Sequence, residues 1–136
     1  AAAMGAEGNA MSAEYHMHLS RLASLLGGYH YRYGSEVQLH QALSTVLTDA
    51  GFEHEREVAL DARNRADFWL EGIVIEVKVD GSLAAALRQC QRYLALPQVH
   101  AVLLASTQRW ADTAMAKRPE LAGKPFHIVR LRRQTL

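Results

Sequence analysis

The amino-acid sequence predicts an α/β protein in which a mixed central sheet is flanked by helices. Short segments rich in β-branched and aromatic residues follow one another in the middle of the chain, which is typical of strands. Segments with a helical spacing of apolar residues stand before and after them. The mostly apolar segment His100–Ser106 indicates a strand buried at the centre of the sheet. With 136 residues the chain has the size of one domain, which we expect over residues 12–136.

Two helices are expected in the first part of the chain. Ser12 is a suitable N-cap for the first, which runs to about Leu26 with its apolar residues on one stripe. Residues 1–11 lack the charged and apolar regions of a secretory signal, and we interpret them as a loose tail or a remnant of cloning. Residues 35–38, Ser-Glu-Val-Gln, have the pattern of a capping box and predict the start of a second helix. The polar aromatic connection over residues 29–33 has no defined shape in the sequence.

Strands and helices share the rest of the chain. Asp80-Gly81-Ser82 interrupts a strand pattern and leads into a helix that stops before Pro97. The expected elements are strands over His54–Leu60, Arg65–Leu70 and Ile73–Val79, a helix over Leu83–Leu96, the strand His100–Ser106, a short helix around Arg109–Lys117 and a last strand around Phe126–Leu131.

A two-residue turn, Glu71-Gly72, connects two of these expected strands into a hairpin. Such a turn fixes the register of the two strands, and its glycine supplies the positive φ that the turn requires. In this register Asp67 lies directly opposite Glu76. Because side chains alternate along a strand, Asp67, Glu76 and Lys78 share one face of the hairpin, while the other face is apolar.

The two opposed carboxylates point to a functional site. Like charges directly opposite on a sheet repel each other, so a positive group is expected between them. Lys78 is one candidate, and a divalent cation is another, because Mg²⁺ is commonly bound by one or two carboxylates together with water and phosphate oxygens. For Glu76-Val77-Lys78 alone, the alternative is an exposed strand face with mixed charges. The position of Asp67 opposite Glu76 argues against that alternative.

These residues resemble the motif of the PD-(D/E)XK nuclease superfamily. In that superfamily an acidic residue on one strand of a hairpin is followed by an acid-x-lysine triplet on the next, as Asp67 is followed by Glu76-Val77-Lys78 here. Ala66 stands where the name-giving proline would be. The resemblance implies a restriction-endonuclease-like αβββαβ core and catalytic roles for Asp67, Glu76 and Lys78. It also implies a Mg²⁺ or Mn²⁺ ion held by the two acids and the carbonyl of Val77.

Two further features agree with the resemblance. Gln89 and Tyr93 match the glutamine-x-x-x-tyrosine motif of RecB-like members, and their spacing puts both on one helical face, where they would position the substrate. Glu36 resembles a glutamate that in many members completes the metal site from the preceding helix. The alternatives are a tyrosine packed on the sheet beside a solvated glutamine, and a glutamate favoured by the helix dipole. Arg88 and Arg92, next to the motif, are candidate nucleic-acid contacts.

Basic residues are concentrated in the second half of the chain. Residues 1–68 carry 5 Lys and Arg against 9 Asp and Glu, whereas residues 69–136 carry 10 against 5. This asymmetry is compatible with a phosphate-attracting surface and equally with a solvated face that ends in a basic tail. The basic residues concerned are Arg88, Arg92, Arg109, Lys117, Arg118, Lys124, Arg130, Arg132 and Arg133.

Composition limits the remaining choices. Cys90 is the single cysteine, which excludes a disulfide within the chain and suits a cytoplasmic location. No apolar run has the length of a membrane span, so no membrane partner is expected. We therefore expect a Mg²⁺- or Mn²⁺-dependent endonuclease or exonuclease of phage, repair or recombination type, acting on DNA rather than RNA, with a homodimer or a partner protein assisting it. The alternative is a non-cleaving nucleic-acid-binding module or assembly scaffold with the same fold.

Overall fold

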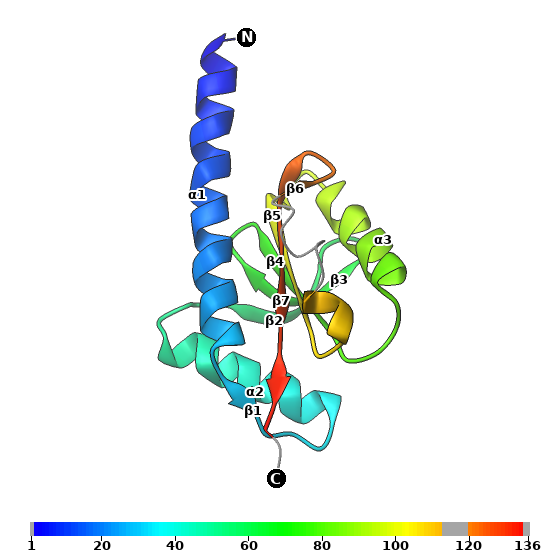
Figure 1. Ribbon diagram of the computed structural model, residues 1–136. Coiled ribbons are helices and arrows are strands. Elements are labelled where there is room, and N and C mark those ends of the chain that lie inside the picture. Colours follow the sequence, from blue (N-terminus) through cyan, green and yellow to red (C-terminus); the bar gives the residue numbers. More distant parts are fainter. Residues whose placement is uncertain (1, 113–119, 135–136) are drawn as a thin grey trace.

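A mixed sheet forms the centre of the protein, with helices on both of its faces (Figure 1). The computed structural model describes residues 2–112 and 120–134, and for residues 2–9 it describes the backbone alone. The helical elements are α1 (Ala2–Gly27), α2 (Glu36–Asp49), α3 (Leu83–Leu94) and the 3-10 helix η1 (Arg109–Asp112). The strands are β1 (His30–Tyr31), β2 (Glu55–Ala59), β3 (Arg65–Leu70), β4 (Ile73–Lys78), β5 (Ala101–Ser106), β6 (Glu120–Leu121), β7 (Lys124–Arg130) and β8 (Arg132–Arg133).

The sheet combines antiparallel and parallel pairing. Its strand order is β2-β3-β4-β5-β7-β6. β2, β3 and β4 form an antiparallel meander, β4, β5 and β7 are parallel to one another, and β6 is antiparallel to β7. The parallel step from β4 to β5 passes through α3, as expected for a connection that must cross over the sheet. β1 and β8 form a separate parallel pair at the lower end of the molecule (Figure 1). The expected class, a mixed sheet flanked by helices, is confirmed.

Each face of the sheet carries its own hydrophobic core. On one face α1 and α2 pack through their leucines onto one set of alternate strand residues, which includes Phe68 and Ile75. On the other face α3 and η1 pack onto the opposite set, which includes Val74 and Phe126. The all-buried pattern of β5 fits its place between two parallel neighbours. The apolar face expected for the hairpin is therefore the face covered by α1 and α2.

The hairpin of β3 and β4 has the register that the sequence predicts. Leu70 pairs with Ile73 next to the turn, and the pairing continues away from the turn to Phe68 with Ile75. Glu71 and Gly72 both have positive φ values, 40° and 92°, which is the combination that a type I′ turn requires. Gly72 is also closely surrounded, because a Cβ atom there would stand 2.8 Å from the ring of His100.

Serine caps begin the two helices that flank the hairpin in the chain. Ser35 accepts a hydrogen bond from the backbone N–H of Gln38, as the capping box predicts. The side chain of Gln38 then accepts from the N–H of Gly34, one residue before the cap. Ser82 caps α3 in the same way, through the N–H of Ala85. These caps satisfy donors that the first turn of a helix leaves without partners.

Several element boundaries differ from the expectation. α1 begins at Ala2, so the segment interpreted as a loose tail is helical and Ser12 lies inside the helix. The expected helix around Arg109–Lys117 begins as η1, and its residues from 113 on lie outside the described residues. The sequence did not predict the two-residue strands β1, β6 and β8. No helix in the described ranges is long and apolar enough to cross a membrane.

Candidate functional site

Asp67 lies where β3 leaves the regular ladder. The backbone pairs between β3 and β4, counted from the turn, end at Phe68 with Ile75, so Asp67 is the first residue of β3 beyond them. Beyond that point the Oδ2 atom of Asp67 accepts a hydrogen bond of 2.8 Å from the backbone N–H of Val77. On the other side, the register of β2 with β3 places Glu57 opposite Asp67, and Glu57 has a positive φ of 51°. The backbone is thus locally distorted around a carboxylate that is bonded into the sheet.

Glu76 is almost completely buried on the α3 face of the sheet. Its side chain is enclosed between β4 and α3, and the residue is 3% exposed. Its Oε1 atom accepts a hydrogen bond of 3.0 Å from the hydroxyl of Tyr93, and its Oε2 atom lies 3.3 Å from the ammonium nitrogen of Lys78. Lys78 is partly exposed, so the ion pair stands at the boundary between the core and solvent.

Burial and a neighbouring charge together disfavour the ionised form of Glu76. Loss of solvation raises the pKa of Glu76 most, the negative charge of Asp67 raises it further, and Lys78 and the Tyr93 hydroxyl oppose this in part, which leaves a value of about 8. A carboxyl group in this position is stabilised by a bound proton or by an added cation. The negative charge of Asp67 is therefore close enough to oppose ionisation of Glu76, as the hairpin register predicts.

Tyr93 connects α3 to this acid. Its side chain is 1% exposed, and its hydroxyl lies 2.8 Å from the carbonyl oxygen of Arg65 as well as 3.0 Å from Glu76. The same hydroxyl accepts a hydrogen bond of 2.9 Å from the side chain of Gln89. Burial and the charge of Glu76 raise the pKa of Tyr93 well above its ordinary value, so the hydroxyl keeps its proton. Gln89 and Tyr93 are brought together as their spacing predicts, and Tyr93 contacts the buried acid.

Glu36 is not brought to the two acids. It lies in the first turn of α2, with a side chain that is 55% exposed and 3.6 Å from His40. His40 in turn packs against the ring of Phe68, on the face of the sheet opposite to Glu76. Within the described ranges, no three His, Cys, Asp or Glu side chains are grouped so that they could hold a metal ion.

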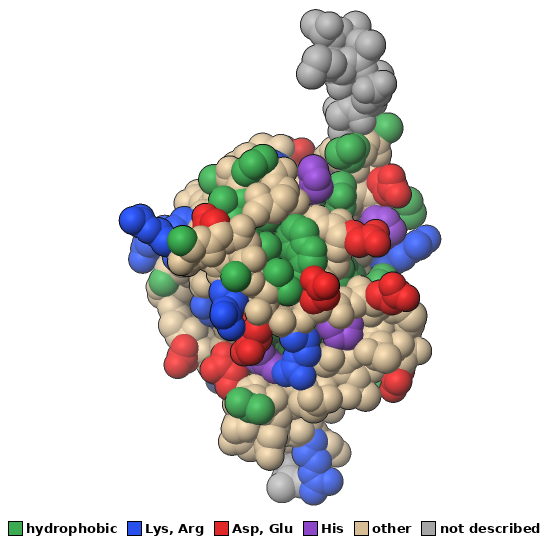
Figure 2. All heavy atoms as spheres, turned by 180° about the vertical axis from the view of Figure 1, so that it is seen from behind, with side chains coloured by type: hydrophobic (Ala, Val, Ile, Leu, Met, Phe, Trp, Pro, Cys, Tyr) green, Lys and Arg blue, Asp and Glu red, His purple; other side chains and the backbone are tan. Residues whose placement is uncertain are grey.

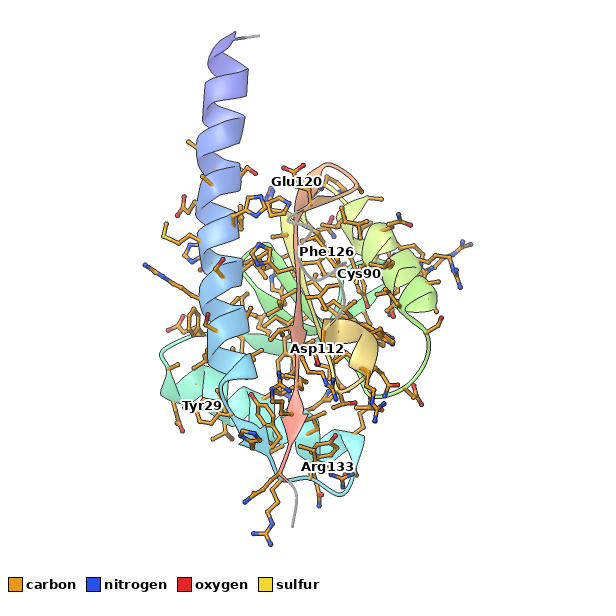
Figure 3. All side chains as sticks on the ribbon, in the orientation of Figure 1. Tyr29, Cys90, Asp112, Glu120, Phe126 and Arg133 are labelled. Carbon is orange, nitrogen blue, oxygen red and sulfur yellow. The ribbon has the colours of Figure 1, made fainter. Side chains whose placement is uncertain are left out.

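The remaining predicted residues lie on α3. Arg88 and Arg92 are both exposed there. Cys90 is fully buried against the sheet (Figure 3), and burial raises the pKa of its thiol, which makes it a packing residue rather than a nucleophile.

A polar row at the end of the parallel strands was missed by sequence reasoning. Lys78, Ser106 and Arg130 are register partners on β4, β5 and β7. The buried hydroxyl of Ser106 donates to the carbonyl of Lys78 at 2.7 Å, and Arg130 pairs with Asp112 of η1 at 2.7 Å. A serine at the end of an otherwise apolar strand was the only signal of this row in the sequence.

The acids do not line the apolar cavity on the other face of the molecule. That cavity, of about 470 Å³, lies between α1 and the tip of the hairpin, where Tyr15, Phe52 and Leu70 are bordered by acidic side chains. The candidate site is therefore defined by its polar contacts and its burial rather than by a deep pocket.

Comparison with known proteins adds no relative, since no family model, no curated protein and no solved structure is significantly similar to the chain.

Proposed function

We propose that this protein is a Mg²⁺- or Mn²⁺-dependent nuclease that hydrolyses phosphodiester bonds, with DNA as its substrate. The observation that carries the proposal is the buried carboxyl of Glu76, which stands beside Asp67 and is contacted by Lys78 and Tyr93. Burying the carboxyl of Glu76 beside the half-buried Asp67 costs stability, and a bound cation would offset that cost. The chain order α2-β2-β3-β4-α3-β5 supports the resemblance to the PD-(D/E)XK superfamily.

The donor set fits a hard divalent cation. It consists of one carboxylate from β3 and, from β4, a second carboxylate and a backbone carbonyl oxygen, without histidine or cysteine. Mg²⁺ and Mn²⁺ prefer such oxygen ligands. The contacts of Asp67 and Glu76 use only part of the acceptor capacity of their oxygens. Asp67, Glu76 and the Val77 carbonyl would hold the ion. When bound, it would activate water and neutralise charge on the phosphate.

The side chains around the acids divide the remaining work. The hydrogen bond from Val77 fixes the orientation of Asp67, and the Tyr93 hydroxyl fixes that of Glu76. Lys78 is partly exposed and has its ammonium next to Glu76, so it is placed to orient the attacking water or to stabilise negative charge on the phosphate. Gln89 is half-buried beside Tyr93 and has a further amide hydrogen to offer the substrate backbone.

Cleavage assays with linear, circular and single-stranded DNA in Mg²⁺, Mn²⁺ or EDTA test the proposal. We expect cleavage that EDTA abolishes and that Glu76→Gln and Lys78→Ala each lower by several orders of magnitude. Glu71→Gln is the matched control, because it makes the same change at the exposed tip of the same hairpin. Lys78→Arg should not restore activity, since a planar guanidinium does not replace a compact ammonium. Wild-type cleavage by Lys78→Ala would remove the proposed site.

A further inference from the structure

A basic and aromatic surface lies at the end of the molecule where β1 and β8 pair. We call it the basic–aromatic ridge and define it as Tyr29, His30, Arg32, Tyr33, Arg132 and Arg133. The pairing of His30 with Arg132 and of Tyr31 with Arg133 joins two segments that are about a hundred residues apart in the sequence. Figure 3 labels Tyr29 and Arg133 at this end, and Figure 2 shows Lys and Arg side chains gathered beside the C-terminal end of the chain.

The ridge has a rigid base. Tyr31 is 3% exposed, and its hydroxyl donates to the carbonyl of Leu26 at the end of α1 at 2.7 Å. The N–H of Gln134 donates to the carbonyl of Tyr31 at 2.8 Å, which extends the contact between the two segments. The short strands are therefore fixed to the body of the protein, and their outward side chains are presented on a firm backbone.

The outward side chains combine positive charge with aromatic faces. Arg32, Arg132 and Arg133 are exposed, and so is Tyr29, at 50%. The guanidinium of Arg133 lies over the ring of Tyr33, 4.5 Å from its centroid, and donates to the Tyr33 carbonyl. The guanidinium of Arg133 thus covers the ring of Tyr33, and the half-exposed ring of Tyr29 lies 6.3 Å from the ring of Tyr31. A guanidinium face and an aromatic ring are both surfaces on which unpaired bases stack.

The ridge is continuous with the candidate site. Arg130 is in register with Lys78, two strands away. The usual spacing of strands puts their backbones roughly 10 Å apart. Both side chains belong to the α3 face of the sheet. Arg130 points to the same face as Phe126 and Ile128, which pack there, and it meets Asp112 of η1. Arg132 follows two residues later and lies 3.8 Å from the same Asp112. Lys78, Arg130 and Arg132 thus form a line of basic residues from the acids to the ridge. Lys78 is paired with Glu76 in this line, and the two arginines share Asp112.

We infer that the basic–aromatic ridge binds single-stranded nucleic acid and holds the strand that enters or leaves the candidate site. Arginines that follow the phosphate backbone, together with aromatic side chains that stack on bases, are the combination by which proteins bind single strands without sequence preference. Base pairs in a duplex cover the faces that Tyr29 and Arg133 would need. The binding itself is independent of cleavage, whereas the path of the strand rests on the proposed function.

Binding of labelled oligothymidylate, followed by fluorescence anisotropy in EDTA, tests this inference. We expect Arg132→Ala/Arg133→Ala to weaken binding by at least tenfold and to lower the slope of log K against log salt by about 1.4, the value for two phosphate contacts on a single strand. The control is Arg21→Ala/Arg63→Ala, which removes two exposed arginines elsewhere. It should change affinity by less than twofold. Equal losses in the two double variants would overturn the inference.

A second pair of variants separates stacking from charge. Tyr29→Ser should weaken binding at least fivefold, whereas Tyr29→Phe should bind within twofold of wild type because the ring is kept. Oligouridylate of the same length tests RNA against DNA, and a duplex should bind at least tenfold more weakly than either. Preference for the duplex, or a Tyr29→Ser variant that binds normally, would contradict single-strand binding.

The two proposals fail in different ways. If oligothymidylate binds through the ridge but no DNA is cut in Mn²⁺, the nuclease assignment is wrong and the ridge stands. If DNA is cut and Arg132→Ala/Arg133→Ala cuts single strands at the wild-type rate and affinity, the ridge is wrong and the nuclease stands.

Discussion

Replacing Asp67 by Asn should change the stability of the protein in opposite directions with and without a divalent metal. The pKa of Glu76 is about 8 in the folded protein against an ordinary 4.5, so the folded protein loses stability as pH rises between these values. The unfolded chain loses this proton first, so the free energy of unfolding falls by about 4 kcal/mol up to pH 7.5. Burial is the larger cause and the charge of Asp67 the second. Removing that charge should therefore restore about 1 kcal/mol, or roughly 3–5 °C in Tm.

Asparagine is a suitable replacement because its side-chain oxygen can still accept the hydrogen bond from Val77. In EDTA we expect Asp67→Asn to melt at the same temperature as wild type or above it. In Mn²⁺ at about a hundred times its dissociation constant, wild type gains about 2.7 kcal/mol by binding the ion. The variant lacks one charged ligand and gains less, so the order of the two melting temperatures reverses.

Differential scanning calorimetry of wild type, Asp67→Asn and Asp49→Asn in both buffers measures the effect. Asp49 is an exposed aspartate at the end of α2, and it controls for loss of a negative charge away from the site. If all three proteins shift equally between EDTA and Mn²⁺, Asp67 and Glu76 do not share an ion, and the proposed mechanism is wrong at its centre.

Three further perturbations follow from particular contacts. Tyr93→Phe removes the hydroxyl that joins Glu76 to α3, and this variant should lose about 1–3 kcal/mol of stability. Tyr93→Phe and Gln89→Ala, as separate variants, should each lower turnover more than tenfold and leave Mn²⁺ affinity in calorimetry within about twofold. Burial and its neighbour His16 lower the pKa of His127, so the unfolded state binds this proton first and wild type should lose stability as pH falls below about 6.5, a loss that His127→Gln should not show in urea titrations. Gly72→Ala should destabilise the protein by roughly 2–4 kcal/mol in the same titrations, because the turn needs a positive φ and the added Cβ meets a ring; a wild-type midpoint would contradict this turn geometry.

Local chemistry determined the elements that the sequence predicts well. The turn Glu71-Gly72 set the register of β3 with β4, and through it brought Asp67 and Glu76 close together just beyond the last pair of the ladder. Serine caps set the beginnings of α2 and α3. Period-two alternation assigned the two faces of the hairpin. These features depend on residues close together in the chain, so the sequence carries them directly.

Contacts between distant segments decided the rest. The partner of the Tyr93 hydroxyl is an acid 17 residues away across two elements, and its burial raises the pKa of that acid. Glu36 became a candidate ligand through the family resemblance, yet the tertiary arrangement leaves its side chain beside His40 and in solvent.

The basic–aromatic ridge depends most completely on the tertiary structure. The sequence shows an aromatic run and, a hundred residues later, a basic run, with no defined shape for either. Only the pairing of β1 with β8 places Arg133 on Tyr33 and aligns the arginines with the end of β7. Two-residue strands have too few residues for a periodic signal, and they form here because the anchoring of Tyr31 and the course of β7 bring their backbones together.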